Sequence, residues 1–188
     1  MILIFCAPSG SGKSTLVHYL LKERNDLEFS VSCTTRAPRG KEVDGKDYYF
    51  ISVEEFLKRI ERDEFVEYEN VYRDTYYGTL KSEIERIESK GHHVVFDVDV
   101  KGGANLERIF GKRALSFFVA PPSIEELRKR LIGRGTDSAE KIEERLAKAS
   151  IEMEDAPLFD RIIVNDDLDK AKAELKEAVE AFLGPCAK

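Results

Sequence analysis

The stretch "FCAPSGSGKST" (Phe5–Thr15) decides the fold, because it joins an apolar run to a turn that combines two glycines with a lysine. The run "ILIF" (2–5) leads into it and an amphipathic pattern, "STLVHYLLKER" (14–24), follows it, so the turn connects a buried strand to a helix. Backbone N–H groups of such a turn point inward and, with the positive end of the helix, bind an anion. The alternative is a glycine turn without a ligand, but the strand-then-helix context favours a phosphate site.

This turn fits the phosphate-loop pattern G-x-x-x-x-G-K-S/T, except that Ala7 stands where the first glycine is usual. Alanine is tolerated at that position if its φ angle stays negative. In this pattern Lys13 reaches the β- and γ-phosphates of a nucleoside triphosphate, and the Ser14 hydroxyl ligates Mg²⁺. The expected ATP-binding loop comprises Ala7, Pro8, Ser9, Gly10, Ser11, Gly12, Lys13, Ser14 and Thr15.

The rest of the chain repeats the order of strand and helix. Apolar runs at 93–100, 114–120 and 161–165 precede helical patterns at 104–110, 123–133 and 168–183. Runs that are apolar throughout are typical of strands buried on both faces of a parallel sheet. The sequence therefore predicts one α/β domain with a doubly wound parallel sheet.

Two segments interrupt this order and are predicted to bind and close over substrates. Residues 32–88 are more polar and mix strand with helix patterns, so we expect an inserted α+β unit. Residues 134–152 form a charged helical segment that we expect to act as a lid. The core then consists of residues 1–31, 89–133 and 153–188.

Composition limits the class of protein. The chain has 188 residues and a net charge of −6, which argues against general nucleic-acid binding because that affinity depends on neutralising phosphates. No apolar run approaches the roughly 20 residues of a membrane helix. The three cysteines have no metal or redox spacing. We therefore expect a cytoplasmic protein in a reducing setting.

The inserted segment carries a second candidate phosphate site. It opens with "SVSCTTRAPRGKEVDGKDYYF" (30–50), in which Arg36 and Arg39 stand three residues apart with several hydroxyls nearby. Two guanidinium groups with hydroxyls suit a phosphate dianion. "FDVDVKG" (96–102) adds Asp97 and Asp99, which we expect to point to one face of a strand, where a metal-organising carboxylate is needed.

Stretches spread over nearly the whole chain together resemble the guanylate kinase family. Besides the phosphate loop they are "SVSCTTRAPRGKEVDGKDYYF", "FVEY", "YYGT", "FDVDVKG", "APPS", "RLIGRGT" and "IVNDDLDKA". The first of these is specific to the family, whereas a phosphate loop is shared by many unrelated proteins. Two departures are Ala7 and "RGKE" (39–42), where the family has Arg-x-Gly-Glu. The resemblance implies the P-loop three-layer fold with a central parallel five-stranded sheet. It also implies transfer of the γ-phosphoryl group of ATP to GMP, giving GDP and ADP, with Mg²⁺ as cofactor.

The resemblance also implies residue roles. Catalytic roles fall to Lys13, Arg36, Arg134 and Arg145. ATP contacts beyond the loop fall to Arg130, Arg134 and, beside adenine, Asn165. GMP contacts fall to Ser32, Arg36, Arg39, Tyr48, Glu67, Tyr77, Thr79, Asp97 and Asp99, and the metal ligands are Ser14 and Asp97.

These assignments agree with the chemistry of guanine. The carboxylates of Glu67 and Asp99 accept from N1–H and N2–H, while the hydroxyls of Ser32 and Thr79 donate to O6. Adenine presents the opposite pattern and leaves buried polar groups unpaired, a mismatch that discriminates strongly.

The tyrosine pairs at 48–49 and 76–77 follow strand geometry, in which neighbours point to opposite faces. We therefore expect Tyr48 and Tyr77 to contact the ligand, and Tyr49 and Tyr76 to be structural.

Three other interpretations compete with this one. A guanylate kinase-like scaffold domain would bind partner proteins, but Lys13, Ser14 and the two insertion arginines argue against it. A related kinase for another phosphorylated acceptor, such as a ribose bisphosphate, is disfavoured by the guanine set. A switch-type NTPase needs no second phosphate clamp. The sequence decides neither tolerance for dGMP nor the choice between a monomer and a weak homodimer.

Overall fold

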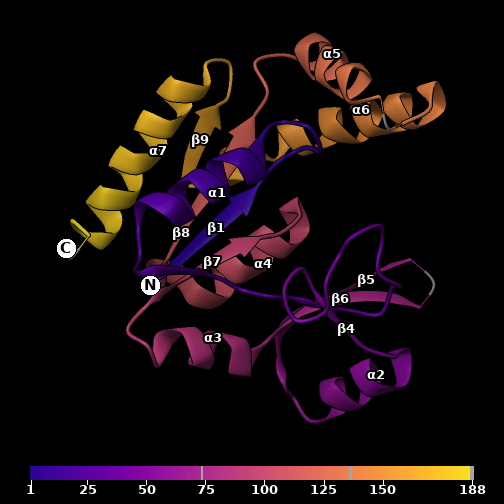
Figure 1. Ribbon diagram of the computed structural model, residues 1–188, viewed down its shortest axis with the longest axis vertical. Coiled ribbons are helices and arrows are strands. Elements are labelled where there is room, and N and C mark those ends of the chain that lie inside the picture. The colour runs from indigo at the N-terminus through magenta and orange to yellow at the C-terminus, as the bar shows by residue number, and fades with distance from the viewer. Residues whose placement is uncertain (73, 136, 187–188) are drawn as a thin grey trace. The chain divides into compact units, whose positions relative to one another are not determined.

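The computed structural model describes residues 1–72, 74–135 and 137–186, without the side chains of residues 71, 72 and 134. Its internal contacts divide the chain into two units, Met1–Asp26 with Val95–Lys188, and Leu27–Val94. Figure 1 shows the elements of both. The first unit carries the phosphate loop, and the second includes the whole of the segment 32–88 that the sequence marks as an insertion.

A five-stranded parallel sheet confirms the predicted central sheet. Its order is β2-β7-β1-β8-β9, and the strands span Leu27–Phe29, His93–Asp97, Ile2–Cys6, Ala114–Ala120 and Arg161–Val164. The register pairs Ile2 with Ala114 and Phe117 with Arg161. In this order β1 is central, so the loop that follows it begins at the carboxyl edge of the sheet, where α/β proteins bind ligands.

Helices cover both faces of the central strand. All five residues of β1 are buried, and both α1 (Lys13–Glu23) and α4 (Val100–Phe110) contact this strand. The helix α7 (Leu168–Leu183) contacts α1 and β9 (Figure 1). Continuous burial explains why these strands are apolar throughout rather than alternating.

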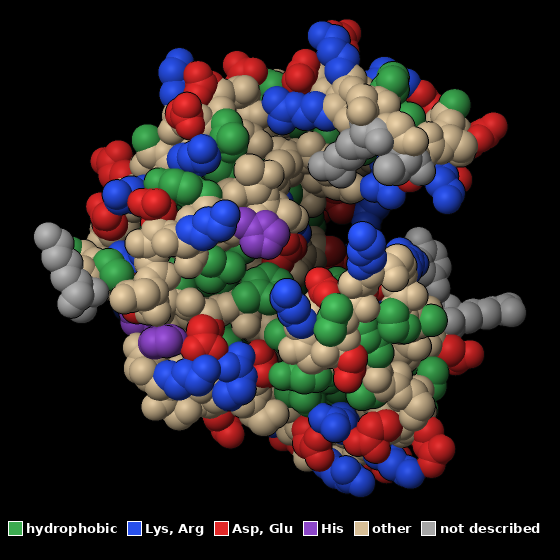
Figure 2. Space-filling view, in the orientation of Figure 1, with side chains coloured by type: hydrophobic (Ala, Val, Ile, Leu, Met, Phe, Trp, Pro, Cys, Tyr) green, Lys and Arg blue, Asp and Glu red, His purple; other side chains and the backbone are tan. Residues whose placement is uncertain are grey.

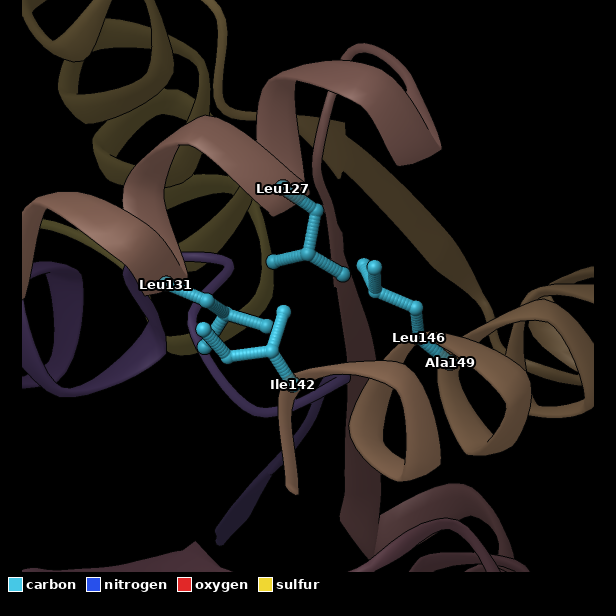
Figure 3. Packing of buried hydrophobic residues seen from close by; sticks show 5 residues of the cluster. All are labelled: Leu127, Leu131, Ile142, Leu146 and Ala149. Carbon is cyan, nitrogen blue, oxygen red and sulfur yellow. The ribbon is translucent and has the colours of Figure 1, made fainter. Parts of the chain in front are cut away.

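The helices α5 (Ile124–Arg134) and α6 (Ala139–Glu154) pack against each other in the first unit. Figure 3 shows the side chains that form this contact, and the buried members are Leu127, Leu131, Ile142, Leu146 and Ala149. Serine caps begin both helices, because Ser123 accepts from the Glu126 N–H and Ser138 accepts from the Lys141 N–H. Two short 3₁₀ turns, Gly111–Arg113 and Ala156–Leu158, complete this unit.

The second unit is built on a separate four-stranded sheet. Its order is β4-β3-β6-β5, and the strands span Tyr49–Phe50, Cys33–Thr34, Thr75–Leu80 and Phe65–Tyr72. The helices α2 (Val53–Glu61) and α3 (Lys81–Glu88) flank these strands in the chain. The buried cluster of this unit consists of Cys33, Phe56, Phe65 and Leu80, with the rings of Phe56 and Phe65 stacked 4.3 Å apart.

One expectation about the strand at 93–100 is wrong. The strand ends at Asp97, and Asp99 instead caps α4 by accepting from the Gly102 N–H at 2.8 Å. Asp97 and Asp99 therefore do not share the face of one strand. An aspartate is a favourable helix N-cap because its carboxylate accepts from an N–H in the first turn that has no partner within the helix. This cap outweighs the β propensity of Val98 and Val100.

Charged side chains of both signs are intermixed on the face drawn in Figure 2, as the balance of 30 basic and 36 acidic residues predicts. None of the helices in the described ranges combines the length and apolarity that crossing a membrane requires.

Candidate functional site

The phosphate loop has the backbone of an anion nest. Gly10 and Gly12 have φ angles of 100° and 97°, a region that residues with a side chain rarely adopt. Gly12 is also the N-cap of α1 and has no side chain with which to occupy the free N–H groups there. Ala7 is absent from the described residues with positive φ, so alanine meets no backbone strain at this position.

Lys13 is held at the carboxyl edge of the parallel sheet. Its ammonium forms an ion pair with the Asp97 carboxylate and donates to the Val98 carbonyl at 3.0 Å. The side chains of Lys13 and Asp97 are 17% and 23% exposed, so solvent screens the pair only partly. Lys13 is thus oriented by two oxygens at the end of β7, the strand next to β1: one on its last residue, Asp97, and one on the residue that follows, Val98.

The predicted lid arginines differ in what they contact. Arg145 donates to the Ser9 hydroxyl of the phosphate loop at 2.6 Å and pairs with Asp137 at 3.3 Å. Arg130 pairs with Glu126 on its own helix, one turn away. The side chain of Arg134 lies outside the described residues. Among the described side chains of these arginines, that of Arg145 is therefore the one that hydrogen-bonds to the loop.

Asn165 lies directly after β9 and is 7% exposed. Its side-chain amide donates to the Ser11 carbonyl of the phosphate loop at 2.7 Å, and its backbone N–H donates to Ala120 O at 2.8 Å. The sequence predicts a contact of Asn165 with adenine, and the structure brings its side chain to the loop itself.

In the second unit Arg36 is fixed from several directions. Its guanidinium donates twice to Glu42, at 2.6 and 2.7 Å, once to the Tyr77 hydroxyl at 3.0 Å and once to the Ala37 carbonyl. The ring of Tyr48 lies 4.9 Å from the guanidinium carbon, within cation–π range. These hydrogen bonds raise the pKa of Arg36 above its ordinary value, so the group is always charged.

Glu42 is a functional candidate that our sequence reasoning missed. Besides pairing with Arg36, its carboxylate accepts from the Arg39 N–H at 2.8 Å. Hydrogen bonds from Arg36 and from the Arg39 backbone lower its pKa from 4.5 to about 2. The sequence does contain a signal for this residue. Charged side chains stand at intervals of three residues in this segment, at Arg36, Arg39 and Glu42. Arg39 itself is exposed.

The tyrosine pairs divide as the sequence predicts, with one member of each pair beside Arg36 and the other in the buried cluster, and contact of Tyr48 and Tyr77 with a ligand stays a prediction. The rings of Tyr48 and Tyr77 meet edge-to-face, 5.9 Å apart, beside Arg36. Tyr49 and Tyr76 instead pack against the buried cluster of this unit, and the Tyr49 hydroxyl contacts the Glu83 carboxylate at 3.3 Å. Alternation along a strand explains this division.

The predicted guanine-reading residues are divided between the two units, three in the second and Asp99 in the first. Glu67 and Thr79 face each other across β5 and β6, and the buried Thr79 hydroxyl donates to Glu67 Oε1 at 2.9 Å. Ser32 belongs to the same unit and is half-buried, with its carbonyl accepting from the Tyr49 N–H. Asp99 is exposed in the first unit, where one carboxylate oxygen serves as the cap of α4.

A parallel sheet whose central strand leads into this loop and a lysine-bearing helix defines a P-loop protein. A family model described as guanylate kinase matches residues 1–182. The guanylate kinase of Bacteroides thetaiotaomicron is 59% identical over 97% of this chain and 89% of its own length, and that of Salinibacter ruber is 50% identical over 97% and 96%. The crystal structure of guanylate kinase from Anaplasma phagocytophilum superposes with a TM-score of 0.76 at 31% identity, covering 96% of this chain and 85% of that one. The chain belongs to the guanylate kinase family.

Proposed function

We propose that this chain transfers the γ-phosphoryl group of ATP to GMP, giving GDP and ADP, and that each unit binds one nucleotide. ATP binds at the phosphate loop of the first unit, and the phosphate of GMP binds at Arg36 and its neighbours in the second. The observation that supports the proposal is that one chain holds two separate sets of cationic side chains, Lys13 and Arg145 at the glycine-containing loop and Arg36 held by its neighbours in the second unit. A simple ATPase or switch protein has no use for the second set.

The donor site supplies positive charge for a triphosphate. Lys13 neutralises charge on the β- and γ-phosphates, and Arg145, already at the loop, does so from the lid. The acceptor phosphate is itself an anion, so the reaction needs no general base. Catalysis then consists of positioning the phosphates and stabilising charge on the group in transfer.

The residues present fit a Mg²⁺ ion. Mg²⁺ is commonly held by one or two protein oxygens, with substrate phosphates and waters completing the octahedron. No group of three or more His, Cys, Asp or Glu in the described residues could hold a metal, whereas Ser14 is exposed and Asp97 offers carboxylate oxygens. Ser14 and Asp97 would hold the ion, which supplies charge neutralisation to the phosphates when bound.

The acceptor site supplies a fixed guanidinium and two phenols. Arg36 has five N–H donors, and the four hydrogen bonds named above leave one for the phosphate of GMP. The Tyr77 hydroxyl accepts from Arg36, so its own proton is directed elsewhere and is available to a phosphate oxygen. Tyr48 and Arg39 complete the set.

Guanine selection follows from the carboxylates. Glu67 accepts from guanine N1–H and N2–H, and Ser32 donates to O6. Thr79 gives its proton to Glu67 in the absence of ligand, so this hydroxyl must turn if it is to donate to O6 as well. Asp99 retains one carboxylate oxygen beyond its helix cap for the role that the family resemblance implies. A monomer or weak homodimer, action on dGMP and a cytoplasmic location belong to the same proposal.

The test is direct measurement of GDP formed from ATP, Mg²⁺ and GMP by the wild type and by Lys13→Ala. Removal of one charge-stabilising donor costs on the order of 100-fold or more in turnover. We expect that loss with GMP affinity unchanged within a few-fold, because Lys13 belongs to the donor site. Unaltered turnover in Lys13→Ala would show that the donor site is wrongly assigned.

A further inference from the structure

Asn165 makes an unusual contact for a residue expected beside a base. Its amide is buried and aims at the main chain of the phosphate loop, where Nδ2 donates to the Ser11 carbonyl at 2.7 Å. The end of β9 fixes its backbone, because the Asn165 N–H extends the parallel ladder to Ala120 O at 2.8 Å. The amide is therefore presented to the loop from the edge of the sheet.

This hydrogen bond sets the orientation of one peptide group. In a planar trans peptide the carbonyl and the N–H of the next residue point in opposite directions. Because the Ser11 carbonyl points to Asn165, the N–H of Gly12 must point away from Asn165, toward the side on which the loop binds an anion. The opposite orientation would direct a carbonyl oxygen at the phosphates.

Gly12 shows how closely the amide approaches. A Cβ atom built on Gly12 would overlap Asn165 Nδ2, so the glycine is required by this contact as well as by its φ of 97°. The same residue is the N-cap of α1. The Asn165 amide thus lies against the loop at the residue where the helix begins.

We propose that Asn165 is a positioning residue that holds the phosphate loop in its anion-binding form, and that it acts on the triphosphate rather than on the base. The proposal rests on the proposed function, since it concerns the donor site of that reaction. If the proposal holds, substitution of Asn165 weakens binding of the phosphates whether or not the ligand carries adenine.

The test compares ATP with inorganic tripolyphosphate, which has no base. Affinity for each is measured by calorimetry for the wild type, Asn165→Ala and the isosteric Asn165→Asp, whose carboxylate would face the Ser11 carbonyl. We expect both ligands to lose affinity by the same factor, about tenfold in Asn165→Ala, which is the effect of one hydrogen bond of ordinary strength. Asn165→Asp should lose more. Asp166→Ala, an exposed neighbour, is the matched control and should bind both ligands as the wild type does.

A loss confined to ATP would overturn the proposal and return Asn165 to the adenine, and unchanged affinity for both ligands would overturn it too. Cooperative thermal unfolding of each variant verifies the fold, and Asn165→Asp, which keeps the volume, provides the comparison if Asn165→Ala is unfolded. Turnover with saturating ATP and varied GMP should show an unchanged KM for GMP. Because tripolyphosphate binding needs no acceptor, failure of the wild type to phosphorylate GMP would leave this test intact.

Discussion

At the scale of single residues, the second unit depends on a carboxylate placed between two arginines. Glu42 binds the Arg36 guanidinium through both oxygens and also the Arg39 backbone, so it links the two residues expected to hold the GMP phosphate. A carboxylate beside an anion site lowers the local positive charge. It also prevents a long, flexible arginine from losing entropy when the ligand binds. We expect this positioning effect to be the larger one.

Glu42→Gln should therefore raise the KM for GMP by roughly tenfold, the cost of weakening a charge-assisted pair, and leave the KM for ATP unchanged. Steady-state kinetics with each substrate varied in turn provides the measurement. Glu54→Gln on α2 is the control, since Glu54 is 78% exposed and pairs only with Lys58 among the described contacts. A lower KM for GMP would mean that Glu42 competes with the phosphate instead.

At the scale of secondary structure elements, the contact between α5 and α6 links the segment predicted to be a lid to the phosphate loop. A Cβ built on Gly10 would lie 2.9 Å from Leu127 Cδ1 and 3.0 Å from Leu131 Cδ2, so the two leucines of α5 pack directly on the loop. The same leucines form the buried cluster with α6 (Figure 3). The same two leucines therefore pack against both the loop and α6, so we expect a change in this packing to affect both.

Leu131→Ala should lower the free energy of unfolding by about 2–5 kcal/mol, because the side chain is completely buried and its removal leaves a cavity in the packing. It should also weaken ATP binding, since the cavity would adjoin Gly10. Urea denaturation and ATP titration measure the two effects. The neighbouring Ile132 is 58% exposed, and Ile132→Ala should change stability by no more than about 0.5 kcal/mol. Equal effects of the two variants would contradict this account.

The elements also show how far the sequence predicts the structure. The strand at 114–120 and the helix at 168–183 match their predicted bounds, because long apolar runs and a strong periodic pattern leave no alternative. The three-residue β2 has too little pattern to be singled out. At Asp99 the start of a helix competes with the continuation of a strand, and the hydrophobic pattern does not show which of the two forms.

Among site residues, the phosphate loop and the tyrosine alternation follow from local rules and were predicted. The contact of Asn165 with the loop joins residues 154 positions apart, and it depends on which strand lies next to β8. A single sequence contains no signal for that distance. Glu42 could have been found from its spacing to Arg36 and Arg39. Its two hydrogen bonds with the Arg36 guanidinium could not have been predicted from that spacing.

At the scale of the whole molecule, the free energy of unfolding should fall at acidic pH, because carboxylates that are paired in the folded state become protonated there. Burial opposes the ionisation of Glu28, but hydrogen bonds from Lys90, Arg86 and His92 outweigh it and lower the pKa of this carboxyl from 4.5 to about 2. Glu42 has a pKa lowered to about 2 as well. A carboxylate with a lowered pKa stabilises the fold at every pH above its unfolded value, and this contribution is lost as the pH falls through the folded value.

The free energy of unfolding should thus be insensitive to these two groups above about pH 5 and should fall between about pH 4.5 and 2. Glu28→Gln should reduce the slope in that window by up to about one proton, as measured by urea denaturation at a series of pH values. Glu61→Gln, an exposed position, should keep the wild-type slope. An unchanged slope in Glu28→Gln would contradict the assignment of acid sensitivity to this cluster.

The central claim is that the molecule phosphorylates GMP with ATP. Its most direct test is coupled ADP release with ATP and Mg²⁺, using GMP, AMP, CMP and UMP in separate reactions and one reaction without an acceptor. This account predicts turnover with GMP alone among the four acceptors, because only guanine offers two N–H donors to carboxylates and an acceptor to hydroxyls. ADP release without an acceptor, or equal rates with AMP, would contradict it.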